Sequence, residues 1–240
     1  MNPTAKGLTV STDRERAIFN RLSEKYKQTG QIVTPGFVRI EKKIQNGNPK
    51  YDFQILRDTN SDFVTEQKLD RNDKFLATHL GILLMNRIFL IAGEGGDTES
   101  PIGQEVLQTY PNAEVFESRA ADLEALYNGK LSIMVGQTKY VEALDTRRFR
   151  YVPTSQQIIA GNGATPTELN IAIIRQSEQH ENSGFISLTP QIEFDGDQKN
   201  QITLEAPIDA RHVIQNTGRG TLKGESYLVL MMRGFLVTNR

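Results

Sequence analysis

The chain has 240 residues, of which 38% are hydrophobic and 8% are aromatic, so it has enough apolar side chains for a core and a wholly disordered chain is excluded. Its formal net charge of −1 lacks the basic excess that a dedicated nucleic-acid-binding protein carries. The chain contains no cysteine, which excludes disulfide frameworks, thiolate zinc sites and cysteine nucleophiles.

Residues 12–29 form the clearest predicted helix. Thr12 and Glu15 have the spacing of a capping box, and Gly30 is placed to end the helix in a left-handed conformation. The dense charge of this segment predicts that it is not a signal peptide. Basic residues outnumber acidic ones, so the helix either packs on its own domain or reaches a neighbouring subunit or an anionic surface. The residues predicted to face a partner or a membrane are Arg14, Arg16, Ile18, Phe19, Arg21, Leu22, Lys25, Tyr26 and Lys27.

Residues 38–44 and 51–55 are predicted to form a β-hairpin. Apolar and polar side chains alternate along both segments, and Asn46-Gly47 lies between them. Alternation on both sides of an Asn-Gly pair is a strong local signal for two antiparallel strands joined by a tight turn.

The pattern of residues 61–92 fits either a helix or a strand. Asn72 is a candidate cap for a helix, whereas Ile88 to Ile91 is typical of a buried strand. The longest apolar stretch, residues 80–92, is interrupted by Asn86 and Arg87 and is too short to cross a bilayer as a helix, which takes about 20 residues. A second, short helix is predicted at residues 119–127, capped by Ser118.

The rest of the chain is predicted to be a series of short strands. Ten or more strands with two helices predict a mainly β fold, either a sandwich or one or two jelly rolls. Asn and Gln recur in these segments, and amides can form hydrogen bonds across a subunit contact without burying charge. The predicted strands are residues 131–135, 140–144, 148–152, 169–174, 185–188, 192–194, 201–206, 227–232 and 235–237.

No pattern in the sequence predicts catalysis, a cofactor or a bound metal. Residues 93–96 are rich in glycine but lack the ending of a phosphate-binding loop, so we expect an exposed loop. Asp195-Gly196-Asp197 is predicted to be a turn, with a calcium site as the alternative. A pair of catalytic carboxylates that meets only in the folded chain is left open by the sequence. The histidines, none at a zinc-binding spacing, are His79, His180 and His212.

Four stretches in the second half of the chain carry a resemblance to a known family. They are residues 127–133, 143–153, 185–196 and 233–237. These stretches, with the layout of an N-terminal helix followed by many strands, resemble the major capsid proteins of tailless, icosahedral, membrane-containing bacteriophages.

This resemblance implies a double jelly roll. Residues 1–30 would form an N-terminal arm and helix, residues 31–146 the first roll and residues 147–240 the second. Residues 93–103 or 160–166 would form an outer tower. Because 240 residues are few for two eight-stranded rolls, the fold alternative is a single jelly roll or a β-sandwich with long loops.

The resemblance also implies a function without enzymatic activity. The chain would be a virion protein, assembled in the host cytoplasm as trimeric, pseudo-hexagonal capsomers of an icosahedral shell around an internal membrane. Its partners would be further copies of itself, other capsid proteins such as a vertex protein, and the inner lipid membrane through the N-terminal helix, without specific nucleic-acid binding. The alternative from another class is a receptor- or glycan-binding β-sandwich module of a fibre or a secreted complex.

Overall fold

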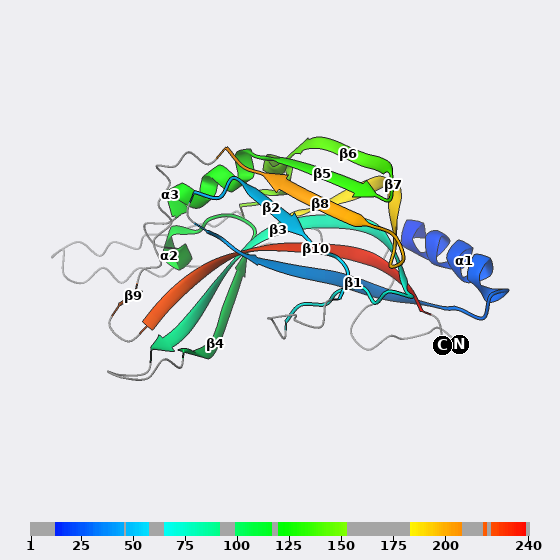
Figure 1. Cartoon of the computed structure of the whole chain (residues 1–240), viewed down its shortest axis with the longest axis horizontal. Coiled ribbons are helices and arrows are strands. Elements are labelled where there is room, and N and C mark those ends of the chain that lie inside the picture. Colours follow the sequence, from blue (N-terminus) through cyan, green and yellow to red (C-terminus); the bar gives the residue numbers. More distant parts are fainter. Residues whose placement is uncertain are drawn as a thin grey trace, which may run out of the picture.

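The protein is mainly β, with two antiparallel sheets that lie one over the other (Figure 1). The computed structural model describes residues 13–45, 47–57, 65–91, 99–116, 120–152, 183–207, 218–219 and 222–238. The predicted loops at 93–96 and 160–166 and the predicted strand at 169–174 lie outside these residues.

The first sheet is built around two long strands, β3 (Lys74–Ile91) and β10 (Leu222–Thr238). On one side β10 pairs along the whole of β1 (Ile32–Lys43). On the other side β3 pairs with β7 (Phe185–Asp195) over its first half and with β4 (Glu99–Gln108) over its second half. The short strand β9 (Gly218–Arg219) pairs with the start of β10.

The second sheet has four strands in the order β2-β8-β5-β6. These strands are β2 (Lys50–Phe53), β8 (Asn200–Glu205), β5 (Lys130–Val135) and β6 (Thr138–Asp145). The sheet covers only part of the first one, so β3, β10 and β4 continue beyond it at the end opposite helix α1 (Asp13–Lys27) (Figure 1).

Helix α1 confirms the prediction made for residues 12–29, although Thr12 lies outside the described residues. Gly30 has a φ of 72°, the left-handed conformation expected after a helix. The predicted inserted helix is a short α-helix, α3 (Ala120–Leu123), that continues as the 3-10 helix η2 (Glu124–Asn128). Two further short helices are α2 (Ala113–Phe116) and η3 (Thr146–Phe149).

The main core lies between the two sheets. Strand β5 shows how the sequence builds it, because Leu131, Ile133 and Val135 alternate with Ser132 and Met134 and only the first three are buried. The predicted strands at 131–135 and 140–144 are therefore confirmed as β5 and β6, and most of 201–206 is confirmed as β8.

The predicted hairpin is wrong, although both of its strands exist. Strand β1 pairs with β10 in the first sheet, whereas β2 pairs with β8 in the second. The turn at Gly47, with a φ of 68°, leads the chain from one sheet to the other. Alternation identifies the buried face of a strand, but it does not identify the strand that pairs with it.

The helix considered for residues 72–83 is wrong, because β3 is one continuous strand. Strand β3 carries apolar side chains on both faces of the first sheet. Leu80 and Ile82 belong to the main core, while Leu83 and Met85 belong to a separate cluster on the outer face. A strand with two buried faces has no alternation, and short apolar runs of this kind resemble a helix in sequence.

Three other predicted strand limits differ from the structure. Residues 148–152 are not a strand, since residues 146–149 form η3. The predicted segments 185–188 and 192–194 form the single strand β7, and 227–232 with 235–237 form the single strand β10. At Gly234 the strand does not end but shifts its register against β3, which is the behaviour of a β-bulge.

The sheets do not follow the predicted division at residue 146. The first sheet combines β1 and β3 with β7 and β10, and the second combines β2, β5 and β6 with β8. Each sheet therefore contains strands from both of the predicted rolls.

Candidate functional site

The apolar stripe of α1 packs against the protein's own first sheet. Ile18, Leu22 and Tyr26 are between 4% and 7% exposed, and Phe19 packs beside them with its ring centre 5.8 Å from that of Phe235. The sheet residues under the helix are Val33, Leu76, Phe235 and Val237. The four apolar residues predicted to meet a partner or membrane are thus in contact with the same chain.

Polar contacts hold α1 on β7. Arg14 donates a hydrogen bond of 2.8 Å to Oγ1 of Thr189. The Tyr26 hydroxyl donates to a carboxylate oxygen of Glu193 at 3.2 Å, and the Lys25 ammonium lies 3.5 Å from the other oxygen. The Tyr26 hydroxyl raises the pKa of Lys25, burial opposes this effect, and the Glu193 carboxylate raises the pKa further. The helix is therefore a docked part of the fold.

The five basic residues predicted for the site all remain exposed. Arg16 lies 3.4 Å from Asp13, a pair on the open surface that contributes little stability. Arg21 and Lys27 make no hydrogen bond or ion pair within the described part of the chain. The exposed side chains of α1 thus form a basic surface, in which the five basic residues outnumber the exposed carboxylates of Asp13 and Glu24, while the apolar side of the helix is occupied. The basic residues are Arg14, Arg16, Arg21, Lys25 and Lys27.

His79 lies under α1 but does not form a catalytic arrangement. Its Nδ1 atom is 3.8 Å from the Glu15 carboxylate and 3.0 Å from Oγ1 of Thr78. A nucleophile and an orienting carboxylate must contact opposite ring nitrogens, and here both groups contact the same one. Burial lowers the pKa of His79, and Arg233 and Arg14 lower it further, against the opposing effect of Glu15. The imidazole is therefore neutral at pH 7 and its contact with Glu15 is not an ion pair.

Docking of α1 predicts that the helix stabilises the fold. The Leu22→Ala variant should lower the free energy of unfolding by about 2–3 kcal/mol, because it removes buried methyl groups and leaves a cavity under the helix. Urea unfolding followed by circular dichroism measures this change. The control is Asn20→Ala on the exposed side of the same helix, which should change stability by less than about 0.5 kcal/mol. Equal stability of the two variants would contradict the docked helix.

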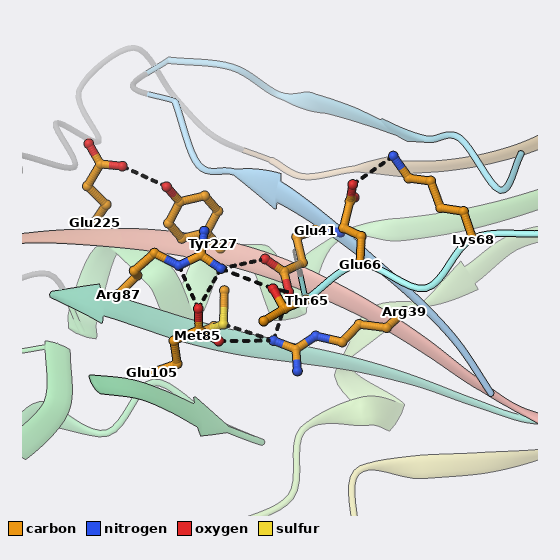
Figure 2. Close-up of polar contacts among 10 residues, drawn as sticks. All are labelled: Arg39, Glu41, Thr65, Glu66, Lys68, Met85, Arg87, Glu105, Glu225 and Tyr227. Atoms are coloured by element: carbon orange, nitrogen blue, oxygen red, sulfur yellow. Dashed lines mark hydrogen bonds and ion pairs between the residues drawn. The ribbon is translucent and has the colours of Figure 1, made fainter. Parts of the chain in front are cut away.

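A network of buried charges crosses the outer face of the first sheet (Figure 2). Its centre is the fully buried carboxylate of Glu41 on β1. Arg39 lies 2.7 Å from one carboxylate oxygen and Arg87 lies 2.9 Å from the other. Arg87, from β3, also lies 2.7 Å from Glu105 on β4. Thr65 donates a further hydrogen bond of 2.6 Å to Glu41. The carboxylate is thereby satisfied by two guanidinium groups and one hydroxyl.

Arg87 links this centre to a second buried pair. Its guanidinium lies over the ring of Tyr227, 4.9 Å from the ring centre. The Tyr227 hydroxyl donates a hydrogen bond of 2.7 Å to Glu225, which lies 2.6 Å from Lys43. Burial raises the pKa of Tyr227, and the neighbouring Glu225 carboxylate raises it further, so the hydroxyl keeps its proton. The network therefore joins β1, β10, β3 and β4 by side chains on one face.

The network also fixes residues 65–68 against the outer edge of β1. The backbone N–H and C=O groups of Arg39 and Gln67 form two hydrogen bonds of 2.9 Å. The N–H of Glu41 donates to the Glu66 carboxylate at 2.9 Å, and Lys68 lies 2.8 Å from the same carboxylate group. Since each buried carboxylate of the network has a cationic partner among the described residues, the arrangement has a structural role.

No local pattern in the sequence predicted this network. Its one signal in the sequence was Arg87, which interrupts the apolar run of β3, but the partners of Arg87 come from segments far away in the sequence. These partners are Glu41, Thr65, Glu105 and Tyr227. The neighbouring Asn86 lies outside the network and donates to the carbonyl oxygen of Val115 at 3.0 Å. The turn predicted at Asp195-Gly196-Asp197 is confirmed, because Asp195 accepts a hydrogen bond of 3.1 Å from the N–H of Asp197 and pairs with Lys74 at 2.6 Å. Within the described residues no cluster of three His, Asp or Glu side chains is arranged to hold a metal ion.

No protein-family model, curated protein sequence or solved structure matches the chain. Among the helices that the structure describes, none is both long and apolar enough to span a membrane.

Proposed function

We propose that this chain is the shell subunit of an icosahedral virus and that its body is a single jelly roll. The observation that carries the proposal is the strand order. Without the accessory strands β4 and β9, eight of the described strands remain in chain order: β1, β2, β3, β5, β6, β7, β8 and β10. One sheet then pairs the first, eighth, third and sixth strands, and the other pairs the second, seventh, fourth and fifth. This is the strand order of a jelly roll, a fold used by viral capsid proteins and by lectins.

The single roll is favoured over the double roll implied by the resemblance. Two eight-stranded rolls need about sixteen strands, and the described residues contain ten. The eight strands of the proposed roll also extend from Ile32 to Thr238, so they use both halves of the chain. The remaining length is in insertions, of which the largest joins β6 to β7.

Two strand edges point to contact between copies through side chains and loops. On the outer edge of β1, Pro35 has no N–H to donate, and both backbone groups of Arg39 and the N–H of Glu41 are already bonded. On the edge strand β6, two register shifts and Ala143 with a φ of 51° interrupt the regular hydrogen-bonding pattern. Such devices prevent edge-to-edge pairing. Contacts between copies would therefore use the sheet faces, the helices and the insertions, and would not use backbone pairing at these two edges.

The mass of the purified protein in solution tests the proposed function. At micromolar concentration, native mass spectrometry and light scattering should show trimers and larger assemblies, as the capsomer proposal requires. A glycan-binding module would instead remain a small oligomer and bind sugars. A protein that stays monomeric over all concentrations and salt conditions would overturn the shell proposal.

The basic surface of α1 is proposed to face the internal membrane. Because the apolar stripe is occupied, the attraction to lipid is electrostatic, about 1 kcal/mol for each basic residue near an anionic surface. Many copies on one shell multiply a weak attraction into strong binding. The isolated helix, with its own acidic residues, should bind weakly.

Assembled protein should therefore bind anionic vesicles in a salt-dependent manner. Arg21→Glu combined with Lys27→Glu should weaken vesicle binding about tenfold or more at low salt, measured by vesicle co-sedimentation. Lys139→Glu on the edge of the second sheet is the control and should leave binding unchanged. Equal vesicle binding by both variants would contradict the proposed membrane contact of α1, but it would not contradict the proposed role as a shell subunit.

A further inference from the structure

The 3-10 helix η3, which follows β6, holds two adjacent arginines outward. Thr146 and Phe149, the ends of η3, are both fully buried. Oγ1 of Thr146 donates to the carbonyl oxygen of Leu126 at 2.8 Å and accepts from the N–H of Gly129 at 2.9 Å. With both ends fixed, the two residues between them, Arg147 and Arg148, are exposed.

These arginines line a surface hollow with a volume of about 500 Å³. Its other walls are Tyr127 and Asn128 at the end of η2 and Asp145 at the end of β6. The Tyr127 hydroxyl points away into the core, where it donates to the carbonyl oxygen of Ile82 at 3.3 Å. The ring therefore forms a fixed wall of the hollow.

The charges around the hollow do not balance. Among the described residues that line it, Asp145 is the one carboxylate, and it is paired with Lys130. The Lys130 ammonium group lowers the pKa of that carboxyl, and the charge of Arg148 lowers it further. Arg147 donates to the neutral side-chain oxygen of Asn128 at 3.2 Å, and Arg148 makes no hydrogen bond or salt bridge within the described part of the chain. With Lys130 offsetting Asp145, two guanidinium charges are left in excess.

We propose that this hollow is an oxyanion site, in which Arg147 and Arg148 together bind a carboxylate or a phosphate group. Guanidinium groups present planar pairs of N–H donors that match the two oxygens of such a group. Helix η3 fixes the backbone of both arginines, and the hydrogen bond to Asn128 orients the side chain of Arg147. The anion has two sources with the same chemistry: an acidic side chain of a neighbouring copy, or a free small anion. Only the first source rests on the proposed shell function.

Nuclear magnetic resonance of the full chain tests the site directly. The Nε–Hε signals of all arginines are followed while inorganic phosphate or acetate replaces chloride at constant ionic strength, at a protein concentration where single copies dominate. The signals of Arg147 and Arg148 should shift and saturate, whereas that of Arg57, which is paired with Asp70 at 3.2 Å, should not. Uniform shifts of all arginines without saturation would overturn the proposal.

Two double variants separate geometry from charge. R147A with R148A should weaken anion binding at least about tenfold, and R147K with R148K should weaken it a few-fold because lysine lacks the paired donors. Both variants should have the same midpoint of urea unfolding as the wild-type protein, since neither arginine side chain is buried. Unchanged anion affinity in the alanine variant would contradict the assignment.

The oligomeric state of the same variants shows whether the bound anion belongs to a neighbouring copy or is a free small anion. If R147A with R148A binds no anion and also loses its oligomers in native mass spectrometry, the site takes a carboxylate of a neighbouring copy. If the variant loses anion binding but assembles normally, the site takes a free anion. The anion titration does not require a shell, so a monomeric protein would overturn the proposed function and leave this site standing.

Discussion

The Arg87→Met variant is expected to lower the free energy of unfolding by about 3–5 kcal/mol. Methionine keeps the length of the apolar stem but removes the guanidinium that lies 2.9 Å from the fully buried carboxylate of Glu41. The same change deprives Glu105 of its 2.7 Å partner and Tyr227 of the cation over its ring. Losing one partner of a buried pair is costly because the other charge stays in a poorly solvating environment. Urea unfolding of the variant measures the change.

A matched arginine separates burial from charge. Arg57→Met removes the 3.2 Å pair with Asp70, but both side chains are more than half exposed, so stability should change by less than about 1 kcal/mol. In Arg87→Met the buried Glu41 carboxylate keeps Arg39 at 2.7 Å but loses its second cation. Adding Glu41→Leu should recover part of the loss, because that under-compensated carboxylate is then no longer buried. A loss below about 1 kcal/mol for Arg87→Met alone would show that the network does not hold the sheet.

The Gly234→Ala variant is expected to lose at least about 3 kcal/mol or to accumulate as insoluble protein. At this position β10 shifts its register against β3, and the backbones approach so closely that a Cβ atom would overlap the carbonyl oxygen of Leu76. The neighbour is backbone in the middle of a sheet, so it cannot move aside as the end of a side chain would. Chemical unfolding of the soluble fraction measures the loss.

The control lies directly opposite in the same sheet. Gly36 on β1 pairs with Gly234, and a Cβ there would lie 3.4 Å from the Cβ of Leu236. Gly36→Ala should therefore change stability by less than about 1 kcal/mol and leave the protein soluble. Similar behaviour of the two alanine variants would contradict the close approach of β10 and β3.

Local signals in the sequence predicted the elements better than their partners. Helix α1 and strand β5 follow from periodicity and end signals that lie within a few residues of each other. The partners of β1 and β2 do not, because residues 227–238 and 202–205 are distant in sequence and belong to different sheets. The turn predicted there is present at Gly47, but each of the two flanking strands pairs with a strand of a different sheet.

The errors in β3 and β10 have two different causes, burial on both faces for β3 and a closely packed glycine for β10. A strand between the main core and the outer cluster is apolar at consecutive positions, as at Ile82, Leu83 and Leu84, so the two-residue period disappears. Gly234 suggested an end to β10 because glycine is common in turns, yet here it serves close packing between strands.

For the candidate site on α1, the sequence predicted that the charged side chains are exposed, but it did not predict which residues the apolar side chains contact. The basic residues of α1 are exposed as the sequence suggested, since a helix with one apolar stripe places the opposite side in solvent. Whether that stripe meets a partner or the same chain depends on Leu76, Phe235 and Val237, which form a complementary patch only in the folded sheet. The network around Glu41 is likewise assembled from segments far apart in sequence, so no local pattern predicted it.

Electron microscopy of the purified full chain under assembling conditions tests the central claim most directly. The proposal predicts closed icosahedral particles, whose repeating unit contains one two-sheet body per chain with the strand order β1-β10-β3-β7 facing β2-β8-β5-β6. Folded, monodisperse protein that forms no particles at any concentration, salt or lipid condition would contradict it.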